Sequence, residues 1–460
     1  MSGISRVLIA NRGEIAVRIL RACIDEELET VLVVSDADRG SLAAQLADRV
    51  VCIGPPSATE SYLDIGRLLA AAMGTGCDAL HPGYGFVSER PELSEACVEA
   101  GIAFVGPGPD AMRRSGDKAA ARATARSLGI PVGHGSDVVG SEAEVSAVAD
   151  EIGFPILLKA AGGGGGRGMR RVDRAEELRG AWTAASAEAQ QAFGDGRLFV
   201  ERFVGRARHV EVQVLADRHG VVVQLGHRDC TLQRRYQKLV EEAPAPDLPG
   251  SLSSEILDAA VRLVGALGYE SAATCEFLVD QERQTFGFLE INARLQVEHP
   301  VSEMVTGVDI VREQLRIAGG APLSFRQDEV EVRGHAVEVR VNAESPEQDF
   351  MPTPGRIETW AAPIGTDVRV DTACFPGWTI TPYYDSLLAK VITRGADRKR
   401  ALAMSRDALR RLQVEGVETT ARFAGDLLAH PEVVAARTHT RWIEDEFLPA
   451  WGAENARGAA

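Results

Sequence analysis

The sequence predicts an α/β protein whose first part is doubly wound and whose C-terminal part is α+β. Its length of 460 residues corresponds to about three domains of about 150 residues each. Residues 7–105 alternate short apolar runs with helical patterns, and such alternation is typical of a parallel sheet with helices on its faces. From about residue 205 the chain is rich in strand patterns before it becomes helical, which indicates α+β organisation.

The elements expected in the first part are short. Buried strands are predicted at 7–10, 30–34, 50–53, 78–80 and 102–105, and helices at 14–22, 65–72 and 92–100. The turn at 11–14 stands where a dinucleotide-binding fingerprint would stand, but it lacks the G-x-G-x-x-G spacing, which disfavours NAD binding. Helical patterns at 398–412 and 419–428 are expected to close the fold.

Charge and cysteine content exclude several classes of function. The net charge of −16 argues against nucleic acid as the main partner, because phosphate neutralisation needs a basic surface. The seven cysteines are scattered without a C-x-x-C, as expected of reduced thiols rather than a disulfide framework or a zinc site. No stretch approaches 18 apolar residues, and the run at 7–10 is too short for a signal peptide. We therefore expect a cytoplasmic protein without a nucleic-acid or membrane partner.

A run of glycines separates two predicted strands in the middle of the chain. The strands lie at 155–159 and 169–172, and residues 162–166 are all glycine. Five consecutive glycines lose much conformational entropy on ordering, yet their bare N–H groups can approach phosphate oxygens. We interpret the run as a mobile lid; a loose surface hairpin is the alternative. The chain contains no G-x-x-x-x-G-K-[ST], which excludes a Walker A loop.

Two lysines flank this lid. Lys159 ends the strand before the glycines, and Lys118 opens a helix predicted at 118–128. An isolated lysine is usually a solvated surface residue. A lysine at the end of an apolar strand beside a glycine loop is better placed to contact a phosphate, so both are candidate phosphate ligands.

Two glutamates are predicted to face each other across a hairpin. By the strand period of two, one strand face carries Thr274, Glu276 and Leu278, and the facing strand carries Phe286, Phe288, Glu290 and Asn292. If the turn is centred near Arg283, Glu276 stands opposite Glu290. Opposed like charges destabilise a sheet unless a cation lies between them, and carboxylate and amide oxygens suit Mg²⁺. The alternative is that one glutamate faces solvent or pairs with an arginine.

A polar run follows the second acidic strand directly. Arg294 can bind a small oxyanion in a bidentate manner, Gln296 can orient it, and Glu298 can accept a proton. Alone, these residues would be interpreted as a polar loop with a satisfied ion pair, but their position beside the predicted metal site favours catalysis. Arg340, on a predicted strand, adds a second anion-binding side chain. Phosphate-binding lysines, a lid and a divalent cation together indicate ATP chemistry.

Short motifs are spread over nearly the whole chain, to about residue 447. They lie at 9–16, 81–86, 116–118, 159–169, 208–211, 228–230, 233–235, 237–238, 241–246, 290–300 and 383–386. In this order they resemble the motifs of the biotin carboxylase branch of the ATP-grasp superfamily. Ordered motifs over such a length are more specific than any single loop.

The resemblance implies the three-domain ATP-grasp architecture, with ATP between the second and third domains. The expected parts are a doubly wound N-terminal domain at 1–116, a linker helix and mobile glycine-rich lid domain at 117–204, a mixed-sheet C-terminal domain at 205–447 and a frayed tail at 448–460.

The resemblance also implies roles for individual residues. It assigns ATP binding to Lys118, Lys159, Gly165, Gly166, Met169, Glu201, Arg202, Val204, His209, Gln233, Tyr236, Glu276 and Glu290. It assigns Mg²⁺, or Mn²⁺ in its place, to Glu276, Glu290 and Asn292. Bicarbonate would be held by Lys238, Arg294, Gln296 and the Val297 backbone, with Glu298 as its base, and Tyr84 and Arg340 would flank the ureido ring of biotin. The catalytic residues would be Lys238, Arg294, Glu298 and Arg340.

The implied activity is ATP- and bicarbonate-dependent carboxylation of biotin through carboxyphosphate. Multidomain relatives carry a biotinyl domain marked by Met-Lys-Met, and this chain has no Met-Lys pair. We therefore expect a subunit that acts on a separate biotin carboxyl carrier protein, alongside a carboxyltransferase subunit, in an acyl-CoA carboxylase of the acetyl-CoA type, as in fatty acid biosynthesis. A homodimer is also expected, although Asp25 stands where family dimers often carry a longer acid, which weakens that expectation. The acyl-CoA that the transferase uses is not predicted.

Two other functions remain open at this point. An ATP-grasp carboxylate–amine ligase would share the lid and the metal site, and a catalytically silent nucleotide-binding scaffold would share the fold. Departures from the family pattern also matter. Tyr236 replaces a common histidine near the nucleotide, and His227 replaces a common glutamate without an evident reason. Arg202 and Val204 differ as well, but backbone atoms are expected to contact adenine there.

Overall fold

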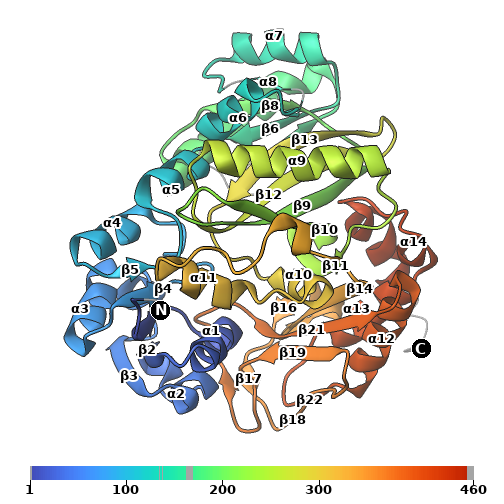
Figure 1. Ribbon diagram of the computed structural model, residues 1–460. Coiled ribbons are helices and arrows are strands. Elements are labelled where there is room, and N and C mark those ends of the chain that lie inside the picture. The colour runs from blue at the N-terminus through green and yellow to red at the C-terminus, as the bar shows by residue number, and fades with distance from the viewer. Residues whose placement is uncertain (1–2, 134, 137, 162–168, 453–460) are drawn as a thin grey trace.

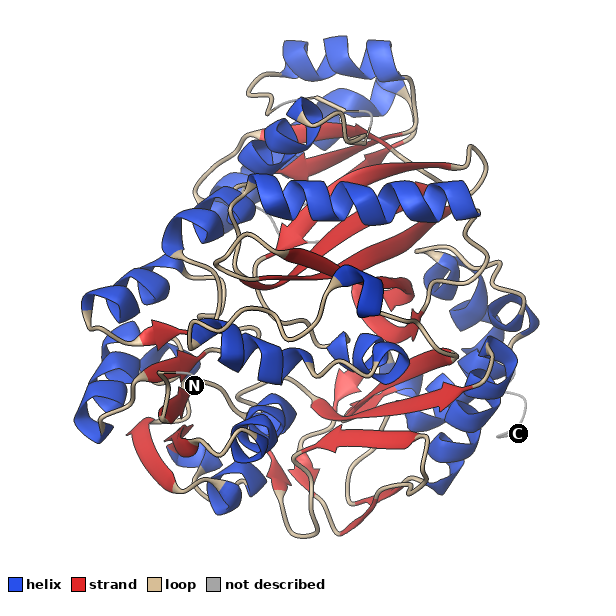
Figure 2. Cartoon of the chain, viewed as in Figure 1, coloured by secondary structure: helices blue, strands red, loops and turns tan. Residues whose placement is uncertain are grey.

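The structure is a computed structural model that describes residues 3–133, 135–136, 138–161 and 169–452. Figure 1 shows an N-terminal part in blue, a smaller part around α7 and α8 at the top, and a large C-terminal part. Figure 2 shows that helices surround the sheets of all three parts. This arrangement confirms the predicted α/β class.

The N-terminal part is a five-stranded parallel sheet in the order β3-β2-β1-β4-β5. Its strands are β1 (Arg6–Ile9), β2 (Glu29–Ser35), β3 (Arg49–Gly54), β4 (Ala79–His81) and β5 (Ala103–Phe104). Its helices are α1 (Gly13–Asp25), α2 (Leu42–Leu46), α3 (Ile65–Thr75), α4 (Pro91–Glu99) and α5 (Pro109–Gly116). Alternate residues of β1, such as Leu8 and Ile9, belong to two different apolar clusters, because helices cover both faces of the sheet.

The second part is a small antiparallel sheet in the order β7-β6-β8. Its elements are α6 (Lys118–Ser127), α7 (Glu142–Ile152), β6 (Ile156–Ala160), β7 (Met169–Val172), α8 (Ala175–Phe193) and β8 (Leu198–Arg202). It has an apolar cluster of its own, which includes Leu158, Val172 and Val200. The strands that flank the glycine run pair as predicted. Residues 162–168, including Gly165 and Gly166, lie outside the described residues.

The C-terminal part is built on an eight-stranded sheet in the order β13-β12-β9-β10-β11-β14-β21-β19. Its strands are β9 (Ala207–Ala216), β10 (Val222–Arg234), β11 (Gln237–Ala243), β12 (Ser271–Asp280), β13 (Thr285–Asn292), β14 (His335–Asn342), β19 (Val368–Thr372) and β21 (Leu387–Gly395). We expected a mixed sheet, but every pair among these strands is antiparallel. Three of these pairs, β9–β10, β10–β11 and β12–β13, are hairpins, and a hairpin can only produce antiparallel neighbours.

Helices and short strands surround this sheet. The helices are α9 (Gly250–Ala266), α10 (His299–Thr306), α11 (Ile310–Ala318), α12 (Arg398–Arg411), α13 (Ala421–Ala429) and α14 (Pro431–Val434). Two-stranded sheets are formed by β15 (Glu344–Ser345) with β16 (Met351–Pro352), β17 (Gly355–Arg356) with β20 (Thr379–Ile380), and β18 (Thr359–Ala361) with β22 (Gln413–Glu415). Helices α12 and α13 are the closing helices that the sequence predicts. Figure 1 shows α9 lying across β12 and β13.

The β12–β13 hairpin has the predicted partners but an extra residue. Glu276 pairs with Glu290, as expected, whereas the register shifts before Phe277 pairs with Phe288. Leu289 is therefore a β-bulge, and a bulge moves the following side chains to the other face of the strand. The prediction that Phe288 and Glu290 share a face is wrong. Phe288 instead packs with its ring centroid 6.0 Å from that of the buried Phe277.

Tyr384 joins the N-terminal and C-terminal parts. Its hydroxyl donates to the Pro56 carbonyl at 2.7 Å and lies 2.6 Å from the Ser35 Oγ, which can donate to it. The Arg12 guanidinium lies 4.1 Å above its ring, a cation–π contact. Both motifs to which these residues belong, 9–16 and 383–386, thus meet at this junction.

The first residues of the expected frayed tail at 448–460 are ordered, contrary to the prediction. Residues 448–452 of the expected frayed tail are helical, and Trp451 is buried with its Nε1 donating to Asp426 at 3.0 Å. The rest of that tail, 453–460, lies outside the described residues. Among the helices that the structure describes, none has the length and apolar character to cross a bilayer.

The bulge predicts that the neighbouring residues Phe288 and Leu289 contribute unequally to stability. Phe288→Ala should lower the free energy of unfolding by about 3–5 kcal/mol, because a fully buried ring is removed from the core. Leu289→Ala should cost about 1 kcal/mol, because that side chain is partly exposed on the opposite face. Urea denaturation of both variants measures this. Equal losses would contradict the register.

Candidate active site

A cavity of about 1200 Å³ opens between the small sheet, the large sheet and the loop after β4. Every predicted site residue that the structure describes lines it: Tyr84, Lys118, Lys159, Met169, Glu201, Arg202, Val204, His209, Gln233, Tyr236, Lys238, Glu276, Glu290, Asn292, Arg294, Gln296, Val297, Glu298 and Arg340. Residues from three separate parts of the chain therefore meet at one place. The roles assigned to each of them stay predictions.

On the side of the small sheet, Glu201 is held between two cations. Its carboxylate contacts the Lys159 ammonium and lies 2.5 Å from the Arg122 guanidinium. Burial would raise the pKa of Glu201, but Lys159 and Arg122 outweigh burial and lower that pKa to about 2. Sequence reasoning missed Arg122. It lies four residues after Lys118 on α6, and this helical spacing is a signal that could have indicated a shared face.

On the side of the large sheet, Lys118 connects the predicted phosphate site to the predicted metal site. Its ammonium lies 3.0 Å from the Glu290 carboxylate. A predicted phosphate ligand thus contacts a predicted metal ligand, as expected of a site where lysines and carboxylates surround a metal–phosphate group. Met169 begins β7 directly opposite Lys159 in the strand register, so both line the same end of the cavity.

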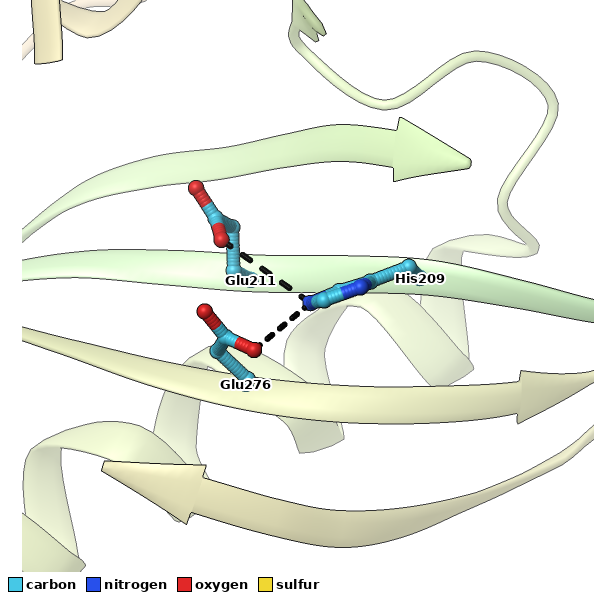
Figure 3. A group of neighbouring side chains, drawn as sticks. All are labelled: His209, Glu211 and Glu276. Carbon is cyan, nitrogen blue, oxygen red and sulfur yellow. Dashed lines mark ion pairs between the residues drawn. The ribbon is translucent and has the colours of Figure 1, made fainter. Parts of the chain in front are cut away.

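Three side chains from the neighbouring strands β9 and β12 of the large sheet converge (Figure 3). Glu211 on β9 pairs with Glu276 on β12, and His209 lies two residues before Glu211 on the same face. The His209 Nε2 lies 2.8 Å from Glu276 and 4.0 Å from Glu211. Burial and the nearby Lys238 would lower the pKa of His209, but the Glu276 and Glu211 carboxylates together outweigh them and the pKa is raised. The ligand atoms of this trio lie close enough together to hold one metal ion.

Glu276 is also the meeting point of the predicted metal and bicarbonate residues. Its Oε1 accepts from the Asn292 amide at 2.9 Å, from the Gln296 amide at 2.8 Å and from the Lys238 ammonium at 3.2 Å. Glu276 and Glu290 are direct partners across the hairpin, and both line the cavity with Asn292. Carboxylate and amide oxygens are the donors that Mg²⁺ prefers, so this set fits the predicted ion.

Glu298 lies between two cations from two different strands. It contacts the Lys238 ammonium of β11, and its other oxygen lies 3.0 Å from the Arg340 guanidinium of β14. Burial would raise the pKa of Glu298, but Lys238, Arg340 and Arg228 outweigh it and hold the pKa well below its usual value. Glu298 is therefore an ionised carboxylate at neutral pH and can accept a proton.

Arg228 donates hydrogen bonds to residues of this cluster, and the sequence had indicated no role for it. It is fully buried and donates to Glu211 at 2.5 Å and to Gln296 at 2.8 Å. It also donates to Gln213, Ser302 and Thr274. A buried arginine with five partners fixes the side chains that it contacts. The only sequence signal was its place in a motif at 228–230.

Arg294 approaches the cavity from the loop after β13. Its Nε lies 3.2 Å from Glu89, and its Nη2 donates to the Asn292 Oδ1 at 3.2 Å. Glu89 also lines the cavity and was not among the predicted residues. Arg294 therefore connects the predicted bicarbonate site to the predicted metal site.

The loop after β4 presents Tyr84, and its shape follows from the motif at 81–86. The Asn11 amide donates to the Pro82 carbonyl at 2.7 Å and to the Tyr84 carbonyl at 2.8 Å. Gly83 has a φ of +65°, in the left-handed region, and a Cβ there would lie 2.9 Å from the Asn11 amide nitrogen. Only glycine fits that position. Tyr84 and Arg340, the predicted biotin neighbours, line the same cavity.

The structure shows the surroundings of two residues that depart from the family pattern, Tyr236 and His227. Arg235 and Tyr236 form the two-residue turn between β10 and β11, both with positive φ, and the Tyr236 side chain is 47% exposed. The His227 imidazole accepts from the Ala245 backbone N–H at 2.9 Å and lies 2.9 Å from the Ser253 Oγ. His227 thus fixes the chain after β11, which explains a polar residue at that position.

Comparison with known proteins identifies the family. Residues 3–112 match the biotin carboxylase N-terminal domain, 117–326 match the carbamoyl-phosphate synthase L chain ATP-binding domain, and 338–445 match the biotin carboxylase C-terminal domain. The chain is 46% identical over 442 residues to biotin carboxylase 1 of Bacillus subtilis (strain 168), covering 96% of this chain and 98% of that protein.

Solved structures agree with this similarity. The crystal structure of a biotin carboxylase–β-γ-ATP complex from Campylobacter jejuni has a TM-score of 0.93 and 40% identity, covering 96% of this chain and 98% of that one. The biotin carboxylase domain dimer of the Hydrogenobacter thermophilus 2-oxoglutarate carboxylase, in complex with MgADP, ADP and bicarbonate, has a TM-score of 0.92 and 40% identity, covering 96% and 97%. The chain therefore belongs to the biotin carboxylase family, with the ATP-grasp architecture and the enzymatic class of an ATP-dependent ligase.

Proposed function

We propose that this chain uses ATP and bicarbonate to carboxylate biotin on a separate biotin carboxyl carrier protein, as the first half-reaction of an acyl-CoA carboxylase. The observation that carries the proposal is the position of Glu298. It is an ionised, buried carboxylate between Lys238 and Arg340, and Lys238 also contacts Glu276 at 3.2 Å on the nucleotide side. A proton acceptor, anion-binding cations and phosphate-binding lysines thus share one cavity.

Bicarbonate would be bound by Lys238, Arg294 and Gln296, with the Val297 backbone beside them. Glu298 takes the bicarbonate proton, and a bicarbonate oxygen then attacks the γ-phosphoryl group of ATP, giving carboxyphosphate and ADP. A carboxylate with a low pKa is a weak base. Proton transfer to Glu298 therefore depends on Lys238 and Arg294, which stabilise the negative charge that develops on the bicarbonate oxygens.

Carboxyphosphate breaks down into CO₂ and phosphate within the cavity. The phosphate takes the ureido N–H proton of biotin, the ring nitrogen attacks CO₂, and Arg340 stabilises the negative charge on the ureido oxygen. Tyr84 would lie beside the ureido ring of biotin. Water would hydrolyse carboxyphosphate, so the site has to close before the reaction, and the lid with its glycine run is the segment we assign to that closure.

Nucleotide binding is assigned to the remaining residues of the cavity. Lys118, Lys159 and His209 would contact phosphates or ribose, and Glu201 would accept from the adenine amino group. The oxygens of Glu276, Glu290 and Asn292 would hold Mg²⁺ or Mn²⁺. When bound, the ion offsets the charge of the phosphates.

The partners follow from the same proposal. We infer a carrier protein, a carboxyltransferase subunit and a homodimer in the cytoplasm; the related Hydrogenobacter thermophilus domain is described as a dimer. Because the chain has a net charge of −16 and carriers of this kind are usually acidic, long-range attraction would be weak and the contact local.

The requirements for phosphate release separate this activity from the two alternatives. The purified protein should release phosphate from ATP when biotin or a biotinylated carrier is present, and the release should disappear when bicarbonate is removed. A carboxylate–amine ligase would require an amine and an organic acid instead, and a silent scaffold would bind ATP without turnover. A coupled phosphate assay distinguishes the three outcomes.

A substitution tests the assignment of Glu298 as the base. Glu298→Gln should lower kcat by about 10²- to 10⁴-fold, because the proton acceptor is lost, while the affinity for ATP changes little. Glu344→Gln is a matched control, since that cavity-lining carboxylate contacts Ser386 and Asn342 rather than the bicarbonate residues. Steady-state kinetics and calorimetric titration with ATP measure both effects. Unchanged turnover in Glu298→Gln would refute the assignment of the base.

A further inference from the structure

A fully buried lysine lies behind the proposed bicarbonate site. Lys390 on β21 has no exposed surface, and it is not among the residues that line the cavity. Its ammonium donates to the Val297 carbonyl at 2.9 Å. It also lies 3.2 Å from the Glu14 carboxylate and 3.7 Å from that of Asp371. Three segments that are distant in sequence thus meet at one cation.

The strand register explains why Lys390 points toward this loop. Lys390 is the direct partner of Arg340 on β14 and of Asp371 on β19, so the three side chains share one face of the sheet. Arg340 contacts the Glu298 carboxylate, and Lys390 contacts the carbonyl of the preceding residue, Val297. Two neighbouring cations therefore hold two consecutive residues of the loop.

The second contact of Lys390 leads to the proposed biotin side of the cavity. Glu14 lies in the first turn of α1, and its other oxygen accepts from the Tyr84 hydroxyl. The Lys390 ammonium is 6.0 Å from the centre of the Tyr84 ring. Through Glu14, one cation is thus connected to both Tyr84 and Val297.

Neutralising the buried Glu14 accounts for one contact of Lys390 but not for the whole arrangement. Asp371 already has a bidentate partner in Arg369, at 2.8 Å and 2.7 Å. Burying an ammonium is unfavourable unless it is well compensated. Burial would lower the pKa of Lys390, but Glu14, Glu338 and Asp371 outweigh it and raise the pKa, so the group stays charged. Its hydrogen bond to a backbone carbonyl of the bicarbonate loop is what a positioning role requires.

We propose that Lys390 is a positioning residue that fixes the Val297–Glu298 peptide and, through Glu14, the Tyr84 hydroxyl, so that the bicarbonate and biotin sites keep a constant relative geometry. The inference rests on the proposed function. It does not involve ATP, because Lys390 contacts none of the residues assigned to the nucleotide. Misplacing reacting groups by about 1 Å can lower a rate about 100-fold.

Two variants test the proposal. Lys390→Met should lower kcat for bicarbonate- and biotin-dependent phosphate release by about 10- to 100-fold, while ATP affinity stays within about threefold. Because this variant leaves Glu14 buried without its cation and can fold poorly, Lys390→Met/Glu14→Gln removes both charges. The double variant should recover thermal stability relative to Lys390→Met, yet its kcat should stay low, because no donor reaches the Val297 carbonyl. If kcat recovers together with stability, Lys390 is merely structural and the proposal is wrong.

A control removes a different, partly buried cation that also pairs with a buried carboxylate. Arg398 pairs with Glu242 at 2.7 Å outside the cavity, so Arg398→Met should lower stability without a comparable loss of kcat.

A second measurement does not depend on turnover. Hydrogen–deuterium exchange should increase at residues 294–299 and 82–86 in Lys390→Met and in the double variant, but not in Arg398→Met. Unchanged exchange in these segments would overturn the proposal, whatever the activity of the wild-type protein. A wild-type protein without carboxylase activity would instead count against the proposed function alone.

Discussion

The site depends on one physical constraint: charges buried in a sheet must be paired. Arg228, Lys238 and Arg340 extend from β10, β11 and β14, and each contacts a carboxylate that is itself almost fully buried. An unpaired ion in such a place would be strongly destabilising. Mutual pairing lowers the pKa of Glu276 and of Glu298 and so keeps both ionised, and shared partners keep Glu211, Glu276 and Glu298 in fixed positions. The same pairing that makes this interior stable therefore sets the geometry available for chemistry.

The eight-stranded antiparallel sheet makes this pairing possible. Its register sets Glu211 beside Glu276 and Lys390 beside Arg340, so these like charges depend on partners of opposite sign, such as Lys238, which contacts both glutamates. The other parts approach this rigid base from two sides. The small sheet contributes Lys159 and Glu201 from strands with a separate core, which suits a part that moves relative to the base. The N-terminal part contributes Tyr84 from a loop fixed by Asn11.

Several features could not be predicted because they depend on contacts between distant segments. The bulge at Leu289 breaks the period of two on which the face of Phe288 was predicted, and nothing local marks it. Arg122 reaches Glu201 across 79 residues, and Lys390 reaches Val297 across 93. His227 had no explanation until its contacts with Ala245 and Ser253 were known. Single-residue patterns carry no information about which of many buried charges will become partners.

The sequence by itself determined the α/β class, the short strands and helices of the N-terminal part, the pairing of Glu276 with Glu290 and, through ordered motifs, the family. These follow from local periodicity and residue chemistry, which act within a few residues along the chain. The tertiary structure alone decided that the eight strands are all antiparallel, that Glu298 lies between Lys238 and Arg340, and that buried cations support the loop from behind. Those features arise from long-range packing, in which the burial of each charge fixes the position of its partner.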